Sequence, residues 1–520
     1  MKLTVDHILD LISLLPINKS FDYVSGGESK AKLISIDREN VKVEIVRVNA
    51  DGSEKNASMT TDILNTLATN IKENKPFKFD NILNGSGNVR STMEAIFAHT
   101  AEFYSCKIRR VKHLIWIPSM PHEIGKIVNY DSIKDYIDDS LHPDSSVKDA
   151  KYLPYLTALR TKPFMLLAGI SGTGKSRIVR ELAKACWKEG DEEFGKNHPR
   201  NFCMVQVKPN WHDSSELIGY VSRINGEKYV VGPFLRFLAK AINDPDTPYF
   251  LCLDEMNLAP VEQYFAEYLS VIESRKQNAD GSITTDPIIP YENTEAYGTL
   301  IDQLFADEAD RKAYKSETDG KRLTIPQNLF VVGTVNMDET TFSFSHKVLD
   351  RAMTLEMNEV NLHSGLTDEG SEIGYIGNCI IGTAAEGKDV YADNKELCDQ
   401  VLAYLEKVNA VLEGTPFKIA YRTRNEFLLY VVNRQLLDEK SQLWQTLDEM
   451  TSMKILSRIE GDSERTKSVL EGLKVLVEEE INKAIPEPEE GKEKLKSITY
   501  AKIEEMLKKL KDSGYTSYWA

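Results

Sequence analysis

The stretch that decides the fold is Gly169-Ile-Ser-Gly-Thr-Gly-Lys-Ser176, which satisfies the phosphate-loop pattern G-x-x-x-x-G-K-[ST]. It follows an apolar run at 164–168 and precedes a helical pattern that extends to about Trp187. In this context backbone N–H groups face phosphate oxygens, and the helix adds its positive N-terminal end. A glycine-rich turn that matches by chance is the alternative.

The residues of this loop have distinct expected roles. We expect the nucleotide-binding set to comprise Gly169, Ser171, Gly172, Thr173, Gly174, Lys175 and Ser176. The Lys175 ammonium would bridge the β- and γ-phosphates, and the Ser176 hydroxyl would be a ligand of Mg²⁺. The expected substrate is therefore a nucleoside triphosphate, with Mg²⁺ as cofactor.

A second apolar run, 249–253, ends in two acids, Asp254 and Glu255. Ligands bind at the carboxyl ends of strands in open α/β sheets. We expect Asp254 to hold Mg²⁺ directly or through water, and Glu255 to polarise the attacking water. A solvated pair of acids is the alternative, but beside the phosphate loop the pair predicts hydrolysis of the nucleotide.

Two further candidates follow a third apolar run, 329–333. Asn336 is expected to orient the water and to sense the γ-phosphate, although it is also a common turn former. Arg351 lies where ring ATPases carry an arginine finger, which stabilises charge on the γ-phosphate in the transition state. Alternatively, Arg351 pairs with Asp350 or Glu356 inside its own module.

Apolar runs of about five residues alternate with helical stretches in the middle of the chain. Such runs (164–168, 203–207, 249–253 and 329–333) indicate a parallel sheet that is buried on both faces. Helical patterns dominate later, at 396–413, 423–435, 463–483 and 495–512. The predicted fold class is α/β: a P-loop module with flanking helices and an α-helical lid, preceded by a small α+β domain.

The predicted domain boundaries follow changes in composition. We expect an N-terminal α+β domain at 1–120, a linker at 121–160, the P-loop core at 161–360, and the lid with C-terminal helices at 361–520. An insertion at 276–325 has its own helical pattern near 300–314, and the sequence assigns it no role.

The composition is that of a folded protein, with 41% hydrophobic and 28% charged residues among 520. A net charge of −16 disfavours a protein that coats nucleic acid over its whole surface. The charge is uneven, because residues 1–120 carry about +2 and the rest about −18. Six scattered cysteines without a C-x-x-C pair, and no apolar run of about 20 residues, predict a cytoplasmic protein that does not span a membrane.

The segment 97–116 mixes aromatic and basic residues. It contains Phe97, His99, Phe103, Tyr104, Lys107, Arg109, Arg110, Lys112, His113 and Trp116. Aromatic faces stack on bases while cations pair with phosphates, so this mixture suits nucleic acid. A basic edge strand with its aromatic residues in the core explains the same pattern.

These motifs resemble those of the AAA+ superfamily and, within it, the McrB-type subunits of modification-dependent restriction systems, over roughly residues 160–515. Further similar segments are Pro209-Asn-Trp211-His-Asp213, Asp254-Glu-Met-Asn257-Leu-Ala-Pro260, Leu349-Asp-Arg-Ala352, Ala420-Tyr-Arg-Thr-Arg-Asn-Glu426 and Lys454-Ile-Leu-Ser-Arg458-Ile-Glu-Gly461. The chain departs from the family at Asn336-Met-Asp338 and at Met353-Thr-Leu355, where further arginines are usual. These departures leave open whether GTP or ATP is the substrate.

The resemblance implies a ring, commonly a hexamer, with nucleotide bound between protomers. It also implies a separate McrC-type partner that carries the nuclease, and DNA recognition by the N-terminal segment. Arg422 would contact the γ-phosphate from the lid as a further nucleotide-binding residue, and an ordinary surface charge is the alternative.

No P-D…(D/E)-x-K nuclease pattern accompanies the predicted strands. A MoxR-like remodelling ATPase with a protein client is the alternative function, and a nucleotide-gated assembly protein is a third.

Overall fold

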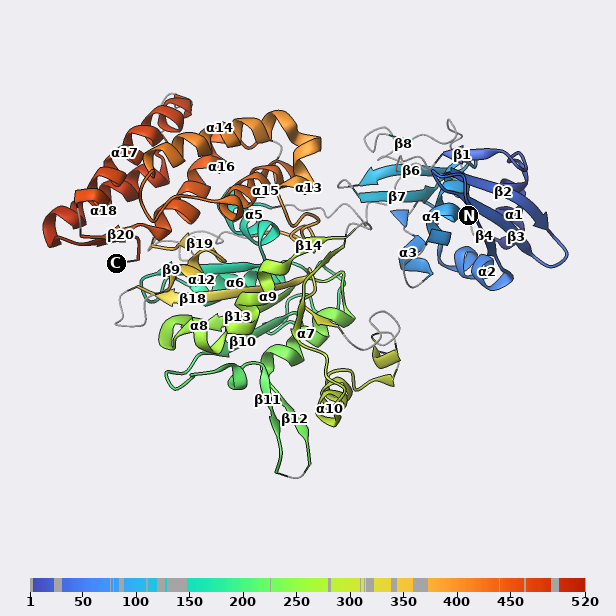
Figure 1. Ribbon diagram of the computed structural model, residues 1–520, viewed down its shortest axis with the longest axis horizontal. Helices are drawn as coiled ribbons and strands as arrows, with labels where there is room; N and C mark the ends of the chain where they lie inside the picture. Colours follow the sequence, from blue (N-terminus) through green and yellow to red (C-terminus); the bar gives the residue numbers. More distant parts are fainter. Residues whose placement is uncertain are drawn as a thin grey trace. The chain divides into compact units, whose positions relative to one another are not determined.

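The structure is a computed structural model of the 520-residue chain (Figure 1). It describes residues 3–22, 30–74, 76–77, 79–83, 88–108, 111–118, 127–128, 147–224, 226–278, 282–308, 310–312, 314, 322–337, 344–358, 373–438, 440–462, 464–487 and 495–519. The chain divides into two compact units, Met1–Pro143 and Asp144–Ala520. The first unit has one hydrophobic core of its own, and the second has two.

The first unit is the expected small α+β domain. Its antiparallel sheet runs in the order β1 (Ser20–Asp22), β2 (Lys30–Asp37), β3 (Lys42–Val48) and β4 (Glu54–Met59). A second sheet has the order β5 (Pro76–Phe77), β7 (Val111–Trp116), β6 (Phe103–Ile108) and β8 (Ile127–Val128). The helices are α1 (Val5–Ser13), α2 (Thr61–Asn70), α3 (Phe79–Ile82) and α4 (Asn88–Ala98).

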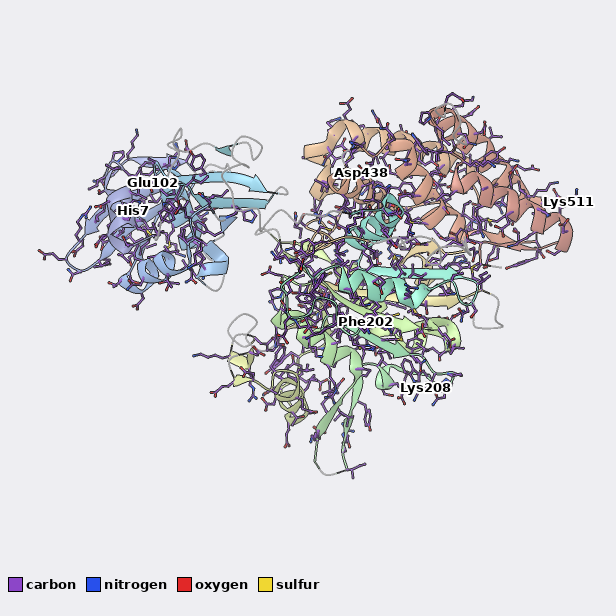
Figure 2. The ribbon with its side chains drawn as sticks, turned by 180° about the vertical axis from the view of Figure 1, so that it is seen from behind. His7, Glu102, Phe202, Lys208, Asp438 and Lys511 are labelled. Carbon is purple, nitrogen blue, oxygen red and sulfur yellow. The ribbon has the colours of Figure 1, made fainter. Side chains whose placement is uncertain are left out.

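The aromatic residues of segment 97–116 belong to the core of this unit. Phe97, Phe103, Tyr104 and Trp116 are buried, so these rings do not form a surface on which bases stack. The Trp116 indole N–H donates to Glu102 Oε2 at 2.9 Å, and His7 Nε2 lies 2.7 Å from the same oxygen (Figure 2). The interpretation with core aromatics is therefore the correct one. Arg109 and Arg110, and the side chains of Lys107 and Lys112, lie outside the described residues.

The second unit is built on a five-stranded parallel sheet. Its order is β10 (Phe202–Gln206), β13 (Tyr249–Asp254), β18 (Leu329–Asn336), β9 (Phe164–Gly169) and β19 (Met353–Glu356). Alternate residues of the central strands enter different cores: Met165 and Leu167 enter one, whereas Phe164 and Leu166 enter the other. Both faces are therefore covered, which explains the continuous apolar runs and confirms the predicted sheet. The edge strand β19 was not predicted, because its four residues form no separate apolar run.

Helices cover both faces of this sheet. The core that contains Met165 also includes side chains of α5 (Leu153–Thr161), α6 (Lys175–Lys184) and the lid. The other core includes α7 (Pro233–Asn243), α8 (Val261–Tyr264), α9 (Ala266–Val271) and α12 (His346–Leu349). A hairpin of β11 (Gly219–Ser222) and β12 (Lys228–Val231), absent from the prediction, projects away from the sheet on the side opposite the lid (Figure 1).

The insertion at 276–325 contains short strands and a helix. They are β14 (Lys276–Gln277), β15 (Ile283–Thr284), β16 (Pro287–Ile289), α10 (Glu295–Leu304) and β17 (Leu323–Thr324). Helix α10 begins five residues before the predicted helical pattern at 300–314 and overlaps its first five residues, and residues 308, 310–312 and 314 are also helical. Helix α10 packs against the β11–β12 hairpin.

The C-terminal part is the predicted helical lid (Figure 1). It comprises α13 (Lys388–Tyr391), α14 (Lys395–Val411), α15 (Tyr421–Leu437), α16 (Leu443–Met450), the π-helical turn η9 (Thr451–Ile455), α17 (Glu464–Glu480) and α18 (Ile498–Ser513). Two short strands, β20 (Glu460–Gly461) and β21 (Thr516–Ser517), pair in an antiparallel manner and join the segment before α17 to the segment after α18. Within the described ranges, no helix combines the length and apolar character needed to cross a bilayer.

Part of the predicted linker is wrong. Residues 121–160 include η4 (Ala150–Tyr152) and nearly all of α5, which belong to the second unit. Leu153, Leu156 and Leu159 are buried, and α5 packs against α15 of the lid. The apolar spacing of this helix therefore outweighs the turn-rich composition that precedes it. Most of 121–146 lies outside the described residues.

Candidate nucleotide-binding site

The loop between β9 and α6 has the backbone that a phosphate cradle requires. Gly172 and Gly174 have φ values of +84° and +85°, a region that favours glycine. A Cβ atom on Gly169 would lie 2.5 Å from the carbonyl oxygen of Met357, so only glycine fits at the end of β9. The N–H of Ile170 donates to Asn358 Oδ1 at 3.0 Å, which anchors the start of the loop.

Lys175 begins helix α6 and lies against this loop. Its side chain is buried, and the ammonium donates to the carbonyl oxygens of Gly169 at 2.9 Å and Ile170 at 2.7 Å. The loop thus holds a cation at the positive end of a helix, an arrangement that suits a multiply charged anion. Of the other predicted polar members, Ser171 is exposed and Thr173 is half-buried, and Thr173 Oγ1 donates to the Ile170 carbonyl at 3.1 Å.

Three oxygen-bearing side chains meet beside the loop. The Ser176 hydroxyl donates to Asp254 Oδ1 at 2.5 Å, and the Thr334 hydroxyl donates to the same oxygen at 2.8 Å. Hydroxyl and carboxylate oxygens are the donors that Mg²⁺ prefers, with phosphate oxygens and waters completing its shell. Ser176 and Asp254 therefore fit the expected metal site. Among the described residues no cluster of three His, Cys, Asp or Glu side chains offers another metal site.

Glu255 follows Asp254 and has a strained backbone. Its φ of +55° is uncommon for a residue with a side chain, and such strain is found at functional sites. Its N–H donates to Thr334 Oγ1 at 2.9 Å, and Asn336 Nδ2 donates to Glu255 Oε1 at 3.4 Å. The end of β18 therefore holds both the backbone and the carboxylate of Glu255.

The strand order brings the predicted residues together. Strand β18 lies between β9 and β13, and Asn336 is opposite Gly169 in the register. The structure thus places the phosphate loop, Asn336 and the acid pair along one edge of the sheet. Sequence reasoning missed Thr334, whose position two residues before Asn336 in the same strand was the available signal.

Arg351 lies apart from these contacts. Its guanidinium donates to the carbonyl oxygens of Leu269 at 2.8 Å and Lys347 at 2.7 Å. Its partners do not include Asp350 or Glu356. Asp350 Oδ1 instead lies 3.0 Å from Arg458 Nε. Glu356 Oε1 accepts from Lys502 Nζ at 2.9 Å.

Arg422 lies at the start of lid helix α15. Its Nε atom is 2.5 Å from Glu273 Oε2, and its Nη1 atom is 3.9 Å from Asp350 Oδ2. The Arg422 side chain is 38% exposed and its guanidinium is ion-paired, so it is not a fully solvated charge. These ion pairs join the lid to the P-loop core.

The fold and this constellation are similar to those of P-loop nucleotide-binding proteins of the AAA+ class. Residues 164–287 match the AAA domain (dynein-related subfamily), and residues 382–515 match a domain of unknown function, DUF8727. An AAA domain supports nucleoside triphosphatase activity, and the second match covers most of the helical lid.

Comparison with characterised proteins identifies the type of AAA+ protein that the chain resembles. It is 21% identical over 291 residues to the type IV methyl-directed restriction enzyme EcoKMcrB subunit of Escherichia coli K12, covering 56% of this chain and 52% of that protein. It is 27% identical over 167 residues to the type II restriction enzyme NmeDI of Neisseria meningitidis serogroup C, covering 29% of this chain and 46% of that enzyme. The chain spans about half the length of these relatives. The predicted resemblance to McrB-type AAA+ subunits is confirmed.

Proposed function

We propose that the chain is the nucleoside-triphosphate-hydrolysing motor subunit of a modification-dependent DNA restriction system. It assembles as a ring, commonly a hexamer in this family, acts in the cytoplasm, and activates a separate McrC-type nuclease subunit. The observation that carries the hydrolytic part is the contact of Ser176 with Asp254 beside a strained Glu255. The similarity to the Escherichia coli McrB subunit supports the restriction part.

Each residue of the site has a chemical task in this proposal. The loop N–H groups and Lys175 bind the phosphates, and Ser176 and Asp254 hold Mg²⁺, which neutralises phosphate charge when bound. Glu255 accepts a proton from the attacking water, while Asn336 keeps that carboxylate in place. Arg351 of one protomer stabilises the γ-phosphate charge in the site of the next, and Arg422 contacts the phosphate from the lid.

Steady-state phosphate release from GTP and from ATP, each with and without duplex DNA, tests this function. We expect one of the two nucleotides to be hydrolysed in a Mg²⁺-dependent manner, and DNA to change the rate. Lys175→Ala is the control, because loss of the buried ammonium removes phosphate binding. Equal release by the wild type and by Lys175→Ala would contradict the proposal.

DNA recognition by the first unit is supported by the positive charge of one segment of its sequence. Lys107, Arg109, Arg110 and Lys112 are four cations among six consecutive residues. Cations so close together in the chain suit the phosphates of a polyanion.

A salt titration of duplex DNA binding by the full chain measures this contribution. We expect replacement of these four cations by glutamine to weaken binding and to reduce the slope of log K against log salt by up to about 3.6, since each phosphate contact contributes about 0.9. The matched control replaces Lys30, Lys32, Arg38 and Lys42, which also lie in the first unit and each pair with a carboxylate. An equal loss in both variants, or no DNA binding by the wild type at low salt, would contradict DNA recognition and favour a protein client.

A further inference from the structure

A buried network of charges joins the lid to the P-loop core. Glu426 of α15 lies between two lysines: Oε1 is 2.6 Å from Lys162 Nζ, and Oε2 is 2.9 Å from Lys454 Nζ. The side chain of Lys454 is 1% exposed and that of Glu426 is 6% exposed. Lys162 also lies 3.0 Å from Glu273, the acid that pairs with Arg422. Lid and core are thus connected by charged groups that water scarcely reaches.

Lys454 holds the backbone on both sides of Arg351. Its ammonium donates to the carbonyl oxygens of Leu349 at 3.2 Å, Asp350 at 3.1 Å and Ala352 at 2.8 Å. These carbonyls are at the C-terminal end of α12, where a cation is favourable. An ammonium has three N–H donors, and here it faces three carbonyls and a carboxylate. One lid side chain therefore contacts the backbone on both sides of Arg351, and Arg458 contacts Asp350 of the same segment.

The backbone around Lys454 is unusual for a residue that serves only to stabilise the core. It lies in η9, a π-helical turn, and such turns are frequent at functional sites. A buried ion pair is costly, and an apolar side chain of similar volume often serves stability equally well. Three carbonyls converging on one ammonium instead restrict where the backbone can lie.

Glu426 keeps this ammonium in place. Burial by itself raises the pKa of Glu426, but the charges of Lys162 and Lys454 outweigh it, so the pKa lies below its ordinary value. Glu426 is therefore ionised at neutral pH, and its carboxylate ties Lys454 to Lys162. Lys162 is two residues before β9, the strand that leads into the phosphate loop.

We propose that Lys454 is a positioning residue for Arg351. Through the carbonyls of residues 349–352, the lid of one protomer sets the place of the arginine that serves the neighbouring site. The inference rests on the proposed role of Arg351 in trans. It makes Lys454 necessary for hydrolysis in the site of the neighbouring protomer and dispensable for hydrolysis in the site of its own protomer.

Lys454→Met tests this inference in the full chain. We expect kcat to fall between about tenfold and a hundredfold with KM within about twofold, because a misplaced transition-state group lowers turnover and leaves the phosphate cradle intact. Mixing Lys454→Met with Lys175→Ala protomers should restore hydrolysis, since the Lys175→Ala protomer supplies a correctly placed Arg351 to the intact site of its neighbour. Tandem fusions of the two variants ensure that every ring contains both.

Lys502→Met is the matched control. Lys502 is also a buried lid lysine, paired at 2.9 Å with Glu356 of the core, but its ion pairs do not involve residues 349–352. We expect both methionine variants to lower the melting temperature, and only Lys454→Met to lose turnover that mixing restores. If Lys454 only stabilised the fold, Lys454→Met would lose turnover, and mixing with Lys175→Ala protomers would not restore it.

The parallel fusion of Arg351→Ala with Lys175→Ala separates the possible failures. Restored hydrolysis with Arg351→Ala but not with Lys454→Met would overturn the role of Lys454 and leave the proposed function standing. Restoration with neither would overturn the trans assignment of Arg351, and the present inference with it. If Lys454→Met does not fold, Arg458→Gln removes the 3.0 Å contact with Asp350 and is judged by the same outcomes.

Discussion

Replacing Arg351 with alanine is expected to slow hydrolysis by about 10³-fold or more while nucleotide affinity stays nearly unchanged. In its own protomer the guanidinium donates to the carbonyls of Leu269 and Lys347, so it is held at a fixed place instead of moving freely in solvent. A held cation that meets the γ-phosphate of a neighbouring protomer stabilises charge developing in the transition state. Rates of phosphate release and the affinity for a fluorescent nucleotide analogue measure the two effects separately.

The same variant distinguishes action in trans from action in cis. Rings that also contain Lys175→Ala protomers should regain hydrolysis, because each variant supplies what the other lacks. Arg465→Ala, which changes an exposed arginine of α17, is the control and should keep wild-type activity. Hydrolysis by Arg351→Ala at the wild-type rate would remove this residue from the chemistry.

Glu255→Gln is expected to bind nucleotide with unchanged affinity, but its turnover number should fall by a factor of about 10² to 10⁴. The amide keeps the shape of the side chain, and it can still accept a hydrogen bond from Asn336, but it cannot take a proton from water. The backbone contact from Glu255 N–H to Thr334 is unaffected by the change, so the site should keep its geometry. Single-turnover hydrolysis and nucleotide binding, measured on the same preparation, should show a lowered rate constant and an unchanged affinity.

Glu262→Gln is the matched control for this variant. Glu262 is an exposed acid on α8, seven residues further along the chain, and we expect its replacement to leave turnover within about twofold of the wild type. Unchanged hydrolysis in Glu255→Gln, or an equal loss in both variants, would show that Glu255 is not the base.

The elements of the nucleotide site could be predicted because each depends on neighbours in sequence. The loop 169–176 needs only its own glycines and the helix that follows, and Asp254 and Glu255 need only the end of their strand. That the loop and the acid pair share one edge of the sheet follows from the rule that parallel strands present their carboxyl ends at one edge. The structure confirms this arrangement, with β18 between β9 and β13.

The aromatic residues of 97–116 show where sequence patterns fail. Phe97, Phe103 and Trp116 share their segment with basic residues whether they stack on bases or fill a core. Their burial beneath the first unit's sheets distinguishes the two, and burial depends on segments that are distant in the chain. The β11–β12 hairpin escaped prediction for a related reason, because its turn lies within a stretch that also suits a loop.

The sequence by itself determined the elements of this protein: a phosphate loop, an acid pair and an α/β sheet with a helical lid, all encoded in short contiguous patterns. Only the tertiary structure decided that Thr334 holds Asp254 and Glu255, that α5 belongs to the second unit, and that Lys454 holds the segment of Arg351. Contacts of this kind join residues about 80 to 100 positions apart, or helices such as α5 and α15 that are still further apart in the chain. They are set by packing, which local patterns do not encode.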